Sequence, residues 1–193
     1  MSNLTRAHRE LFRRTPDETF DSLDGLWQHC QNQKETSTDL WYPPQELLPT
    51  SDMTLCVGGD GAELGLTDWS FSQVCRLAGV SKDTINRLSS KTASRALQET
   101  LPSADKPLQL LTTGSQIRSI HGVTYTRLWN VELLSMLREF ATDFQPPQQA
   151  AGGGTGLYCG EQDLFCFLID PTGWAEIDGE AFAPGFFVWI SHS

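Results

Sequence analysis

Apolar residues follow a helical period near the start of the chain and form short strand-like runs towards its end. In "FDSLDGLWQHCQNQKE", the residues Leu23, Leu26, Trp27 and Cys30 fall at positions i, i+3, i+4 and i+7, so they share one helical face. The basic segment 5–14 is also predicted to be helical and to end before the first proline. The chain therefore begins with two predicted helices.

The stretch "WSFSQVCRLAGVSKDTINRL" has the pattern of a helix-turn-helix motif. The capping-box spacing in "SFSQ" opens a first helix, and Gly79 ends it. Ser81 caps a second, short helix, and a third spans about residues 90–100. The pattern is typical of DNA-binding proteins, but it also describes helices that only pack against one another.

The segments around these helices predict extended structure. "LWYPPQELLPT" contains three prolines and is predicted to be an arm without regular structure, and "DMTLCV" a short strand. After residue 106 the period changes, and "PLQLLTTGSQIRSIHGVTYTRL" predicts a three-stranded meander. "NVELLSMLREF" then predicts a helix capped by Asn130, with Leu133, Leu137 and Phe140 on one side.

The last third of the chain is predicted to be rich in strands. Residues 145–156, "QPPQQAAGGGTG", read as a flexible Pro/Gly loop, and no Gly-Lys-Ser/Thr follows that would make it a phosphate-binding loop. "DLFCFLID" and "GFFVWI" are buried-strand candidates, and Asp178-Gly179 in "WAEIDGEAF" predicts a β-hairpin.

These elements predict one α+β domain over residues 1–193, with N-terminal helices followed by a mostly antiparallel sheet. The helical part covers about residues 1–105 and the strand-rich part about 107–193.

Composition narrows the class of protein. The chain is 39% hydrophobic and 20% charged, which is typical of a folded domain, and no apolar run reaches membrane-spanning length. The start of the sequence has no secretory signal pattern, so we expect a cytoplasmic protein with no membrane partner. The five scattered cysteines are expected to be reduced, most of them as small apolar core residues.

Charge is unevenly distributed along the acidic chain, whose net charge is −10. Residues 1–75 carry 5 basic and 12 acidic side chains, residues 76–138 carry 9 and 4, and residues 139–193 carry 8 acidic and no basic ones. A positive middle part therefore lies between two negative ends, and the helix-turn-helix pattern opens that positive part.

The positive middle part predicts contact with a DNA or RNA backbone more than sequence-specific binding. Non-specific binding needs only charge, whereas the second helix is too short to read a groove easily. The predicted phosphate contacts are Arg76, Lys82, Arg87, Lys91 and Arg95.

The acidic residues near the end allow a second hypothesis. These are Glu161, Asp163, Asp170, Glu176, Asp178 and Glu180. Most lie at predicted turns, where carboxylates are common, but an acidic face could also bind a basic host protein or nuclease complex. A divalent metal held by these carboxylates is the least favoured alternative.

The sequence contains no recognisable catalytic motif. There is no Gly-x-Ser-x-Gly elbow, no Cys-x-x-Cys pair and no His-x-x-x-His, so we predict no metal site and no cofactor. Nothing in the sequence indicates an enzyme.

Several strings together resemble the phage/plasmid-like protein family, a domain-of-unknown-function family of mobile genetic elements. They are "FSQVCRLAGVSKDTINRLSSKTASRALQETL", "IRSIHGVTYTRLWNVELLSML", "GLYCGEQDLFCFLID", "FAPGFFVWIS" and, near the start, "HRELFRRTPDETFDSLDGLWQHC". The resemblance spans nearly the whole chain and implies a mobile-element setting without assigned catalytic residues. Members usually continue beyond the "FFVW" strand, so this chain is expected to be a short or truncated member.

Two functions are therefore expected. The first is a non-catalytic accessory protein of a phage, prophage or plasmid that acts on nucleic acid or its handling machinery through the basic residues. The alternative is an acidic inhibitor of a host nuclease or defence complex. We also expect self-association through residues 185–190, because a hydrophobic strand at a sheet edge invites pairing with a second chain.

Overall fold

The structure is a computed structural model of the chain. It describes residues 14–59, 61–147 and 156–191. The predicted basic helix at 5–14 lies outside these residues except for its last one, as does most of the predicted loop at 145–156. Among the described residues, no helix is long and apolar enough to cross a membrane.

The chain divides into two compact units. Unit 1 combines Met1–Glu35 with Leu128–Ser193, and unit 2 is the continuous segment Thr36–Arg127. Unit 2 is therefore an insertion between the two parts of unit 1. The α+β class, with mostly antiparallel sheets, is confirmed.

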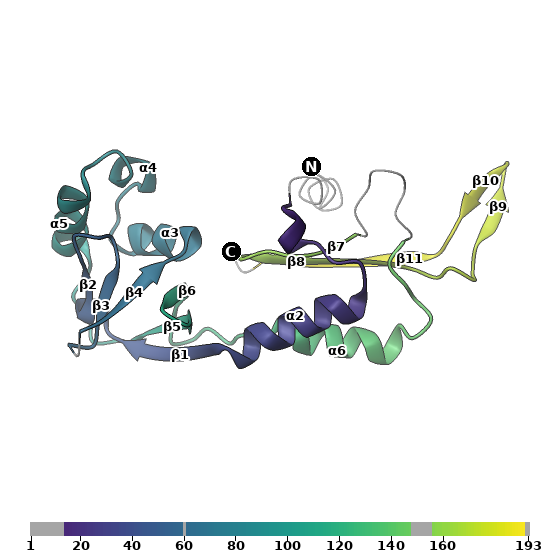
Figure 1. Ribbon diagram of the computed structural model, residues 1–193, viewed down its shortest axis with the longest axis horizontal. Helices are drawn as coiled ribbons and strands as arrows, with labels where there is room; N and C mark the ends of the chain where they lie inside the picture. Colours follow the sequence, from purple (N-terminus) through teal and green to yellow (C-terminus); the bar gives the residue numbers. More distant parts are fainter. Residues whose placement is uncertain (1–13, 60, 148–155, 192–193) are drawn as a thin grey trace. The chain divides into compact units, whose positions relative to one another are not determined.

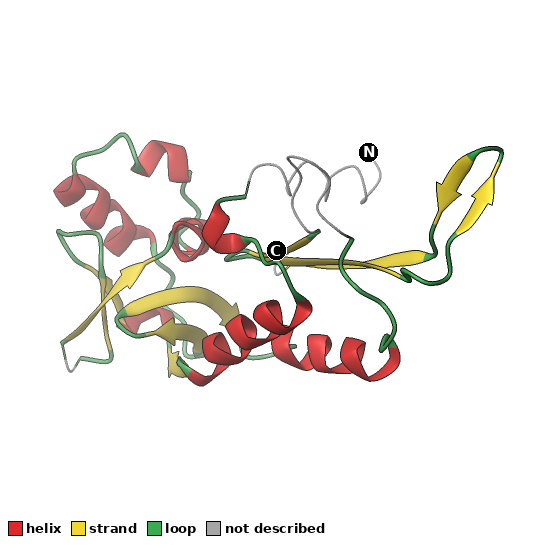
Figure 2. Ribbon diagram, turned by 45° about the vertical axis from the view of Figure 1, so that its right-hand side comes forward, coloured by secondary structure: helices red, strands yellow, loops and turns green. Residues whose placement is uncertain are grey.

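Unit 1 consists of two helices and a three-stranded antiparallel sheet. The helices α2 (Leu23–Glu35) and α6 (Asn130–Phe140) lie side by side along one face of the sheet, which Figures 1 and 2 show from two directions. The sheet has the order β11-β8-β7. Its strands are β7 (Leu157–Cys159), β8 (Asp163–Ile169) and β11 (Gly185–Ser191), and a short 3-10 helix, η1 (Pro16–Glu18), precedes α2.

The apolar faces of the two helices form the core of unit 1 with one face of β8. Leu26 and Cys30 of α2 are buried, as the helical period predicted. In α6 the buried residues are Val131, Leu134 and Leu137, while Phe140 is 68% exposed. Of the side predicted for α6, Leu137 is buried and Leu133 packs against the core, whereas Phe140 lies outside it. Asn130 begins this helix, and Trp129 is its N-cap.

The predicted hairpin around Asp178-Gly179 is confirmed. It joins β9 (Ala175–Ile177) to β10 (Glu180–Phe182), and the two strands form a separate two-stranded sheet. Asp178 and Gly179 have φ angles of 54° and 84°. Positive φ at both central residues is what a two-residue type I′ turn requires, and Asp-Gly is among its preferred sequences.

Unit 2 contains a six-stranded sheet of order β1-β5-β6-β4-β3-β2, in which only β4 and β6 pair in parallel. The strands are β1 (Ser37–Tyr42), β2 (Leu47–Pro49), β3 (Leu55–Val57), β4 (Ala62–Leu66), β5 (Leu108–Thr113) and β6 (Gln116–Gly122). The helices are η2 (Pro44–Glu46), α3 (Asp68–Leu77), α4 (Lys82–Ile85) and α5 (Ser90–Thr100). The core of unit 2 is centred on Leu55, Val74, Leu97, Leu110 and Ile117.

Two predictions for unit 2 were wrong. The proline-rich segment 40–50 is not an irregular arm, because it contains the second half of β1 and all of η2 and β2. Its two adjacent prolines, Pro43 and Pro44, fall between β1 and β2, where no ladder hydrogen bond is lost. The predicted meander has two strands rather than three, since residues 123–127 form a turn and a loop after β6. The first strand begins at Ser37, so residues 1–105 are not mainly helical as expected.

The three helices of the helix-turn-helix pattern are present in altered form. α3 begins at Asp68, and its N-cap is Thr67 rather than Ser70, three residues later, which the capping-box spacing had indicated; Thr67 accepts a hydrogen bond from the Ser70 amide at 3.3 Å. Gly79 follows the helix with φ of 68°, as expected for a helix C-terminal glycine. α5 spans Ser90–Thr100 as predicted.

We predict that Thr36–Arg127 folds when it is produced alone. The segment is continuous, has its own buried core, and its ends are close together, since Arg127 donates to Asp39 at 3.1 Å. Urea denaturation followed by circular dichroism should give one cooperative transition. Leu110→Ala, at a fully buried site, should lower the free energy of unfolding by about 2–5 kcal/mol. A segment without a cooperative transition would contradict this prediction.

Candidate functional site

The five predicted phosphate contacts lie on or beside α3, α4 and α5 of unit 2, and two of them are paired with acids. Lys82 contacts Asp68 at 2.5 Å, and Arg95 contacts Glu99 at 2.7 Å. Their positive charge is therefore partly neutralised within the protein.

The other three basic residues are exposed. Arg76 lies with its guanidinium 5.6 Å from the centre of the Trp69 ring, and Arg87 donates to the Asp83 carbonyl at 3.2 Å. Lys91 is exposed on the first turn of α5. Among the described residues, no carboxylate forms an ion pair with these three side chains.

The geometry of α3–α5 does not suit base reading. α4 is four residues long, which is about one turn, whereas a recognition helix presents several residues along a groove. Ile85 of α4 and Ala93 and Leu97 of α5 are buried in the core of unit 2. The turn between α3 and α4 thus allows three helices to pack on the sheet.

The predicted acidic residues do not form one cluster. Asp163 is buried and Glu161 is half-buried, whereas Glu176, Asp178 and Glu180 are exposed on the β9–β10 hairpin. Asp170 accepts hydrogen bonds from the amide and hydroxyl of Thr172, both at 2.8 Å, and these bonds lower its pKa. In the described part of the chain, no group of three or more His, Cys, Asp or Glu residues is placed to hold a metal.

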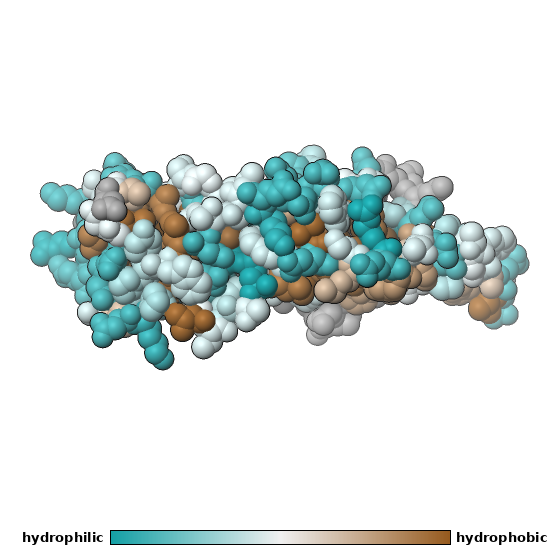
Figure 3. All heavy atoms as spheres, turned by 90° about the horizontal axis from the view of Figure 1, so that it is seen from below, coloured by the Kyte–Doolittle hydropathy of each residue, from teal (hydrophilic) through white to brown (hydrophobic). Residues whose placement is uncertain are grey.

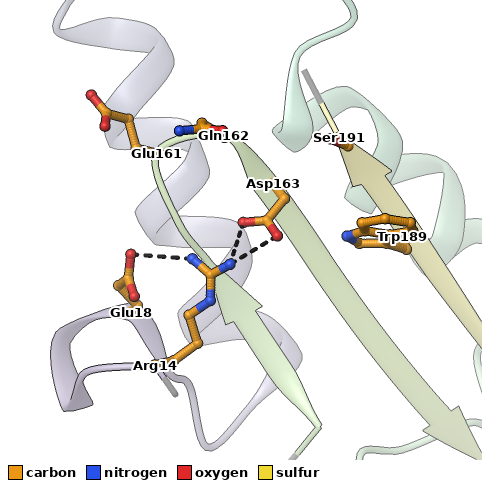
Figure 4. Close-up of a pocket in the computed structure, with 7 residues that line it drawn as sticks. All are labelled: Arg14, Glu18, Glu161, Gln162, Asp163, Trp189 and Ser191. Carbon is orange, nitrogen blue, oxygen red and sulfur yellow. Dashed lines mark hydrogen bonds and ion pairs between the residues drawn. The ribbon is translucent and has the colours of Figure 1, made fainter. Parts of the chain in front are cut away.

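Asp163 belongs to a polar pocket that the sequence did not predict (Figure 4). Arg14 Nη2 lies 2.8 Å from each Asp163 carboxylate oxygen, and Arg14 Nη1 lies 3.4 Å from Glu18. The guanidinium also lies 4.5 Å from the centre of the Tyr158 ring, whose hydroxyl donates to Asp163 at 3.3 Å. Arg14 is thus held by charge, hydrogen bonds and an aromatic face.

The pocket is lined by more acids than bases. Its lining residues are Arg14, Glu18, Glu161, Gln162, Asp163, Trp189 and Ser191. Figure 4 shows the Arg14 side chain turned to Glu18 and Asp163, with Glu161 and Gln162 on the loop that leads into β8. Arg14 is the only cation among the described lining residues, and its guanidinium already binds two carboxylates, so this part of the pocket does not favour an anionic ligand. It is best described as a structural ion-pair site.

A second unpredicted cluster lies around Cys159 of β7. Cys30 of α2 donates to the Cys159 sulfur with an Sγ–Sγ distance of 3.9 Å, and both thiols are buried. Asn130 Nδ2 donates to the same sulfur at 3.6 Å, and Gln33 Oε1 lies 4.0 Å from it. Gln33 in turn contacts His29 Nε2 at 2.8 Å. We call these five residues the thiol cluster.

The thiol cluster changes the acidity of Cys159. Its pKa is lowered to about 6, first by the hydrogen bond from Cys30, then by the hydrogen bond and charge of His29 and the hydrogen bond from Asn130, although burial alone would raise it. Cys166 on the neighbouring strand has only burial acting on it, and its pKa is raised to about 12. Both cysteines lie in the core of unit 1, as expected for most of the five, but Cys159 also has polar neighbours that Cys166 lacks among the described residues.

The β9–β10 hairpin carries an exposed surface of mixed chemistry. Trp174, Ile177 and Phe182 are 60%, 56% and 49% exposed, and none belongs to a core cluster. Figure 3 shows apolar surface among polar side chains at the end of unit 1 that carries this hairpin. With Glu176, Asp178 and Glu180, these residues define what we call the hairpin arm, residues 174–182.

The position of β11 agrees with the expectation of an edge strand. In the described part of the sheet it pairs only with β8, with Val188 opposite Cys166. Phe186 and Val188 pack against the core of unit 1, whereas Phe187 is exposed. Self-association through residues 185–190 stays a prediction.

Comparison with known proteins gives no relative: no protein-family model, curated protein or solved structure matches this chain. The resemblance to the phage/plasmid-like family stays a prediction that these comparisons do not support.

We predict that Asp163→Asn lowers the free energy of unfolding by about 3 kcal/mol, because it leaves the partly buried Arg14 guanidinium without its main counter-charge. Chemical denaturation measures the difference. Glu176→Gln, at an exposed carboxylate, serves as the control and should change stability by less than about 0.5 kcal/mol. Equal effects of the two substitutions would contradict the structural role of the Arg14–Asp163 pair.

Proposed function

We propose that this chain is a non-catalytic protein-binding module whose hairpin arm binds a basic protein surface. The observation that carries the proposal is the exposure of three large apolar side chains beside three carboxylates on one projecting hairpin. This is the acidic, protein-binding alternative that the sequence allowed.

The hairpin arm lacks a core of its own, which supports a binding role. Side chains alternate between the faces of a strand, so Ile177, Glu180 and Phe182 share one face while Glu176 lies on the other. Apolar and acidic groups are therefore mixed on one face of the hairpin, and Trp174 directly precedes β9. A two-stranded hairpin is marginally stable in water, so a partner that covers these side chains would stabilise the arm.

The negative charge of the hairpin arm indicates a partner with a positively charged surface. The region 139–193 contains 8 acidic and no basic residues, so the arm approaches any partner with a negative field. Such a field favours association with a positively charged surface, and a surface evolved to bind nucleic acid is positively charged. In a mobile-element setting, a host nuclease or defence complex has this chemistry.

A pull-down with the tagged full chain from nuclease-treated host lysate tests the proposal. Wild-type protein should capture a basic protein, and the triple variant Trp174→Ser/Ile177→Ser/Phe182→Ser should weaken its binding at least about tenfold, since anchors of this kind carry most of the energy of an interface. The partner is then identified by mass spectrometry, and its affinity for each variant is measured by calorimetry.

Two control variants make the test specific. Glu176→Gln/Asp178→Asn/Glu180→Gln should slow association and reduce its salt dependence, because it removes the field and keeps the apolar side chains. Arg87→Gln/Lys91→Gln, on unit 2, should leave binding unchanged. Equal capture by the wild type and by the variant that replaces the three apolar side chains with serine would contradict the proposal.

A second candidate function is contact with a nucleic-acid backbone through Arg76, Arg87 and Lys91. It is favoured by the exposure of these three residues and by the net positive charge of residues 76–138. The field of the acidic chain opposes such binding, so we rank it second.

Fluorescence anisotropy with labelled single- and double-stranded oligonucleotides tests this candidate. Binding at low salt should be nearly independent of sequence and weaken steeply as salt is added. Arg87→Gln/Lys91→Gln should weaken it, whereas Lys106→Gln, outside this set, should have a smaller effect. Absence of binding at low salt would exclude the candidate.

A further inference from the structure

We propose that Cys159 and Cys30 form an oxidation-sensitive dithiol, in which a hydroperoxide oxidises Cys159 and Cys30 then closes a disulfide between β7 and α2. This inference is independent of the proposed protein-binding function, because the thiol cluster and the hairpin arm share no residue.

The thiols of Cys30 and Cys159 are close enough to form a disulfide after a small movement. The two sulfurs are 3.9 Å apart although the residues are 129 positions apart in the sequence. A disulfide has an S–S distance of about 2.05 Å, so each sulfur has to move about 1 Å. The Cys30 sulfur lies within hydrogen-bond distance of the Cys159 sulfur, which places the second thiol beside the site of first oxidation.

The polar surroundings of Cys159 favour its thiolate form. The amide of Asn130 donates to its sulfur at 3.6 Å, and His29 adds a hydrogen bond and a charge that lower the pKa of this thiol. The thiolate is the reactive form of cysteine towards peroxides. At neutral pH, Cys159 is therefore the thiol of this pair that reacts first.

Gln33 links His29 to Cys159. Its Nε2 lies 2.8 Å from His29 Nε2, while its Oε1 lies 4.0 Å from the Cys159 sulfur. An amide carries both donors and an acceptor, so this side chain connects the imidazole to the thiol.

The chemistry balances with peroxide as the only oxidant. The Cys159 thiolate attacks one peroxide oxygen, the O–O bond breaks, and a sulfenic acid and hydroxide form. Cys30 then attacks the Cys159 sulfur, an S–S bond forms, and water leaves. Overall, two thiols and one H₂O₂ give one disulfide and two waters.

Local opening gives the oxidant access to the buried sulfurs. β7 has three residues and pairs with β8 on one side. On its other side, the described residues contribute a bridge between Thr19 and Tyr158 and a hydrogen bond from Phe20 to Leu157 at 3.1 Å. Short strands with few hydrogen bonds open at a lower free energy than the core.

The test uses the full chain, reduced and then freed of reductant, with H₂O₂ added in equimolar amount. Thiol titration under denaturing conditions should fall from five free thiols towards three, and peptide mass spectrometry should find the linkage between Cys30 and Cys159. Linkages that involve Cys166 should be at least about tenfold less abundant, because a buried neutral thiol is inert. The oxidised chain should also unfold at a higher temperature, since the new bond closes a long loop.

Three variants separate the steps. Cys30→Ser should accumulate a sulfenic acid at Cys159 that dimedone traps, and Cys159→Ala should give neither adduct nor disulfide. Cys166→Ala is the matched control in the same core and should oxidise like the wild type. Circular dichroism checks that each variant folds, and the mapping on wild-type protein needs no variant. Oxidation confined to Cys56, or only intermolecular disulfides, would overturn the proposal.

Discussion

The structure of unit 1 depends on burial of the apolar faces of α2 and α6 against one face of β8. Leu26, Leu134 and Leu164 meet in this core and are fully buried. α2 precedes the inserted unit and α6 follows it, so neither helix can cover its apolar face without the other. The hydrophobic effect therefore has to hold together two parts of the chain that the sequence separates by the whole of unit 2.

An insertion of this kind is tolerated because its ends lie close together. Joining two distant segments through an unfolded loop has an entropic cost that grows slowly with loop length. When the loop folds into its own domain with adjacent ends, burial of that domain's apolar side chains offsets most of this entropic cost. An ion pair between Asp39 and Arg127 joins residues near the two ends of unit 2. In unit 1, an ion pair between Lys34 and Glu132 joins the segment that precedes the insertion to the segment that follows it.

Local patterns of sequence predicted the elements whose structure is determined locally. The Asp178-Gly179 turn, the helical face of α2 and the extent of α5 follow from turn chemistry, period and helix boundaries. β1 was missed because its strand character comes from pairing with β5, far along the chain: Trp41 lies opposite Gln109. The side predicted for α6 was right for Leu133 and Leu137 but not for Phe140, because helical period alone does not fix where the covered face of a helix ends.

The functional clusters could not be predicted for a related reason. Asp163 looked like one of several surface carboxylates, and only the position of Arg14, 149 residues earlier, makes it a buried ion-pair partner. Neither Arg14 nor Asp163 lies in a sequence motif that would indicate its role. Their chemistry arises when the fold places a second group beside them.

Cys159 and Cys166 show how strongly such placement decides chemistry. Both thiols are buried in the same core, and a sequence pattern treats them alike. Among the described residues no polar neighbour shifts the acidity of Cys166, and burial raises its pKa to about 12. Cys159 lies where the N-terminus of α6 and the second and third turns of α2 supply Asn130, Cys30 and His29, which lower its pKa to about 6. Because α2 and α6 are the helices that the core must bring together, the packing that closes unit 1 also assembles the polar surroundings of this thiol.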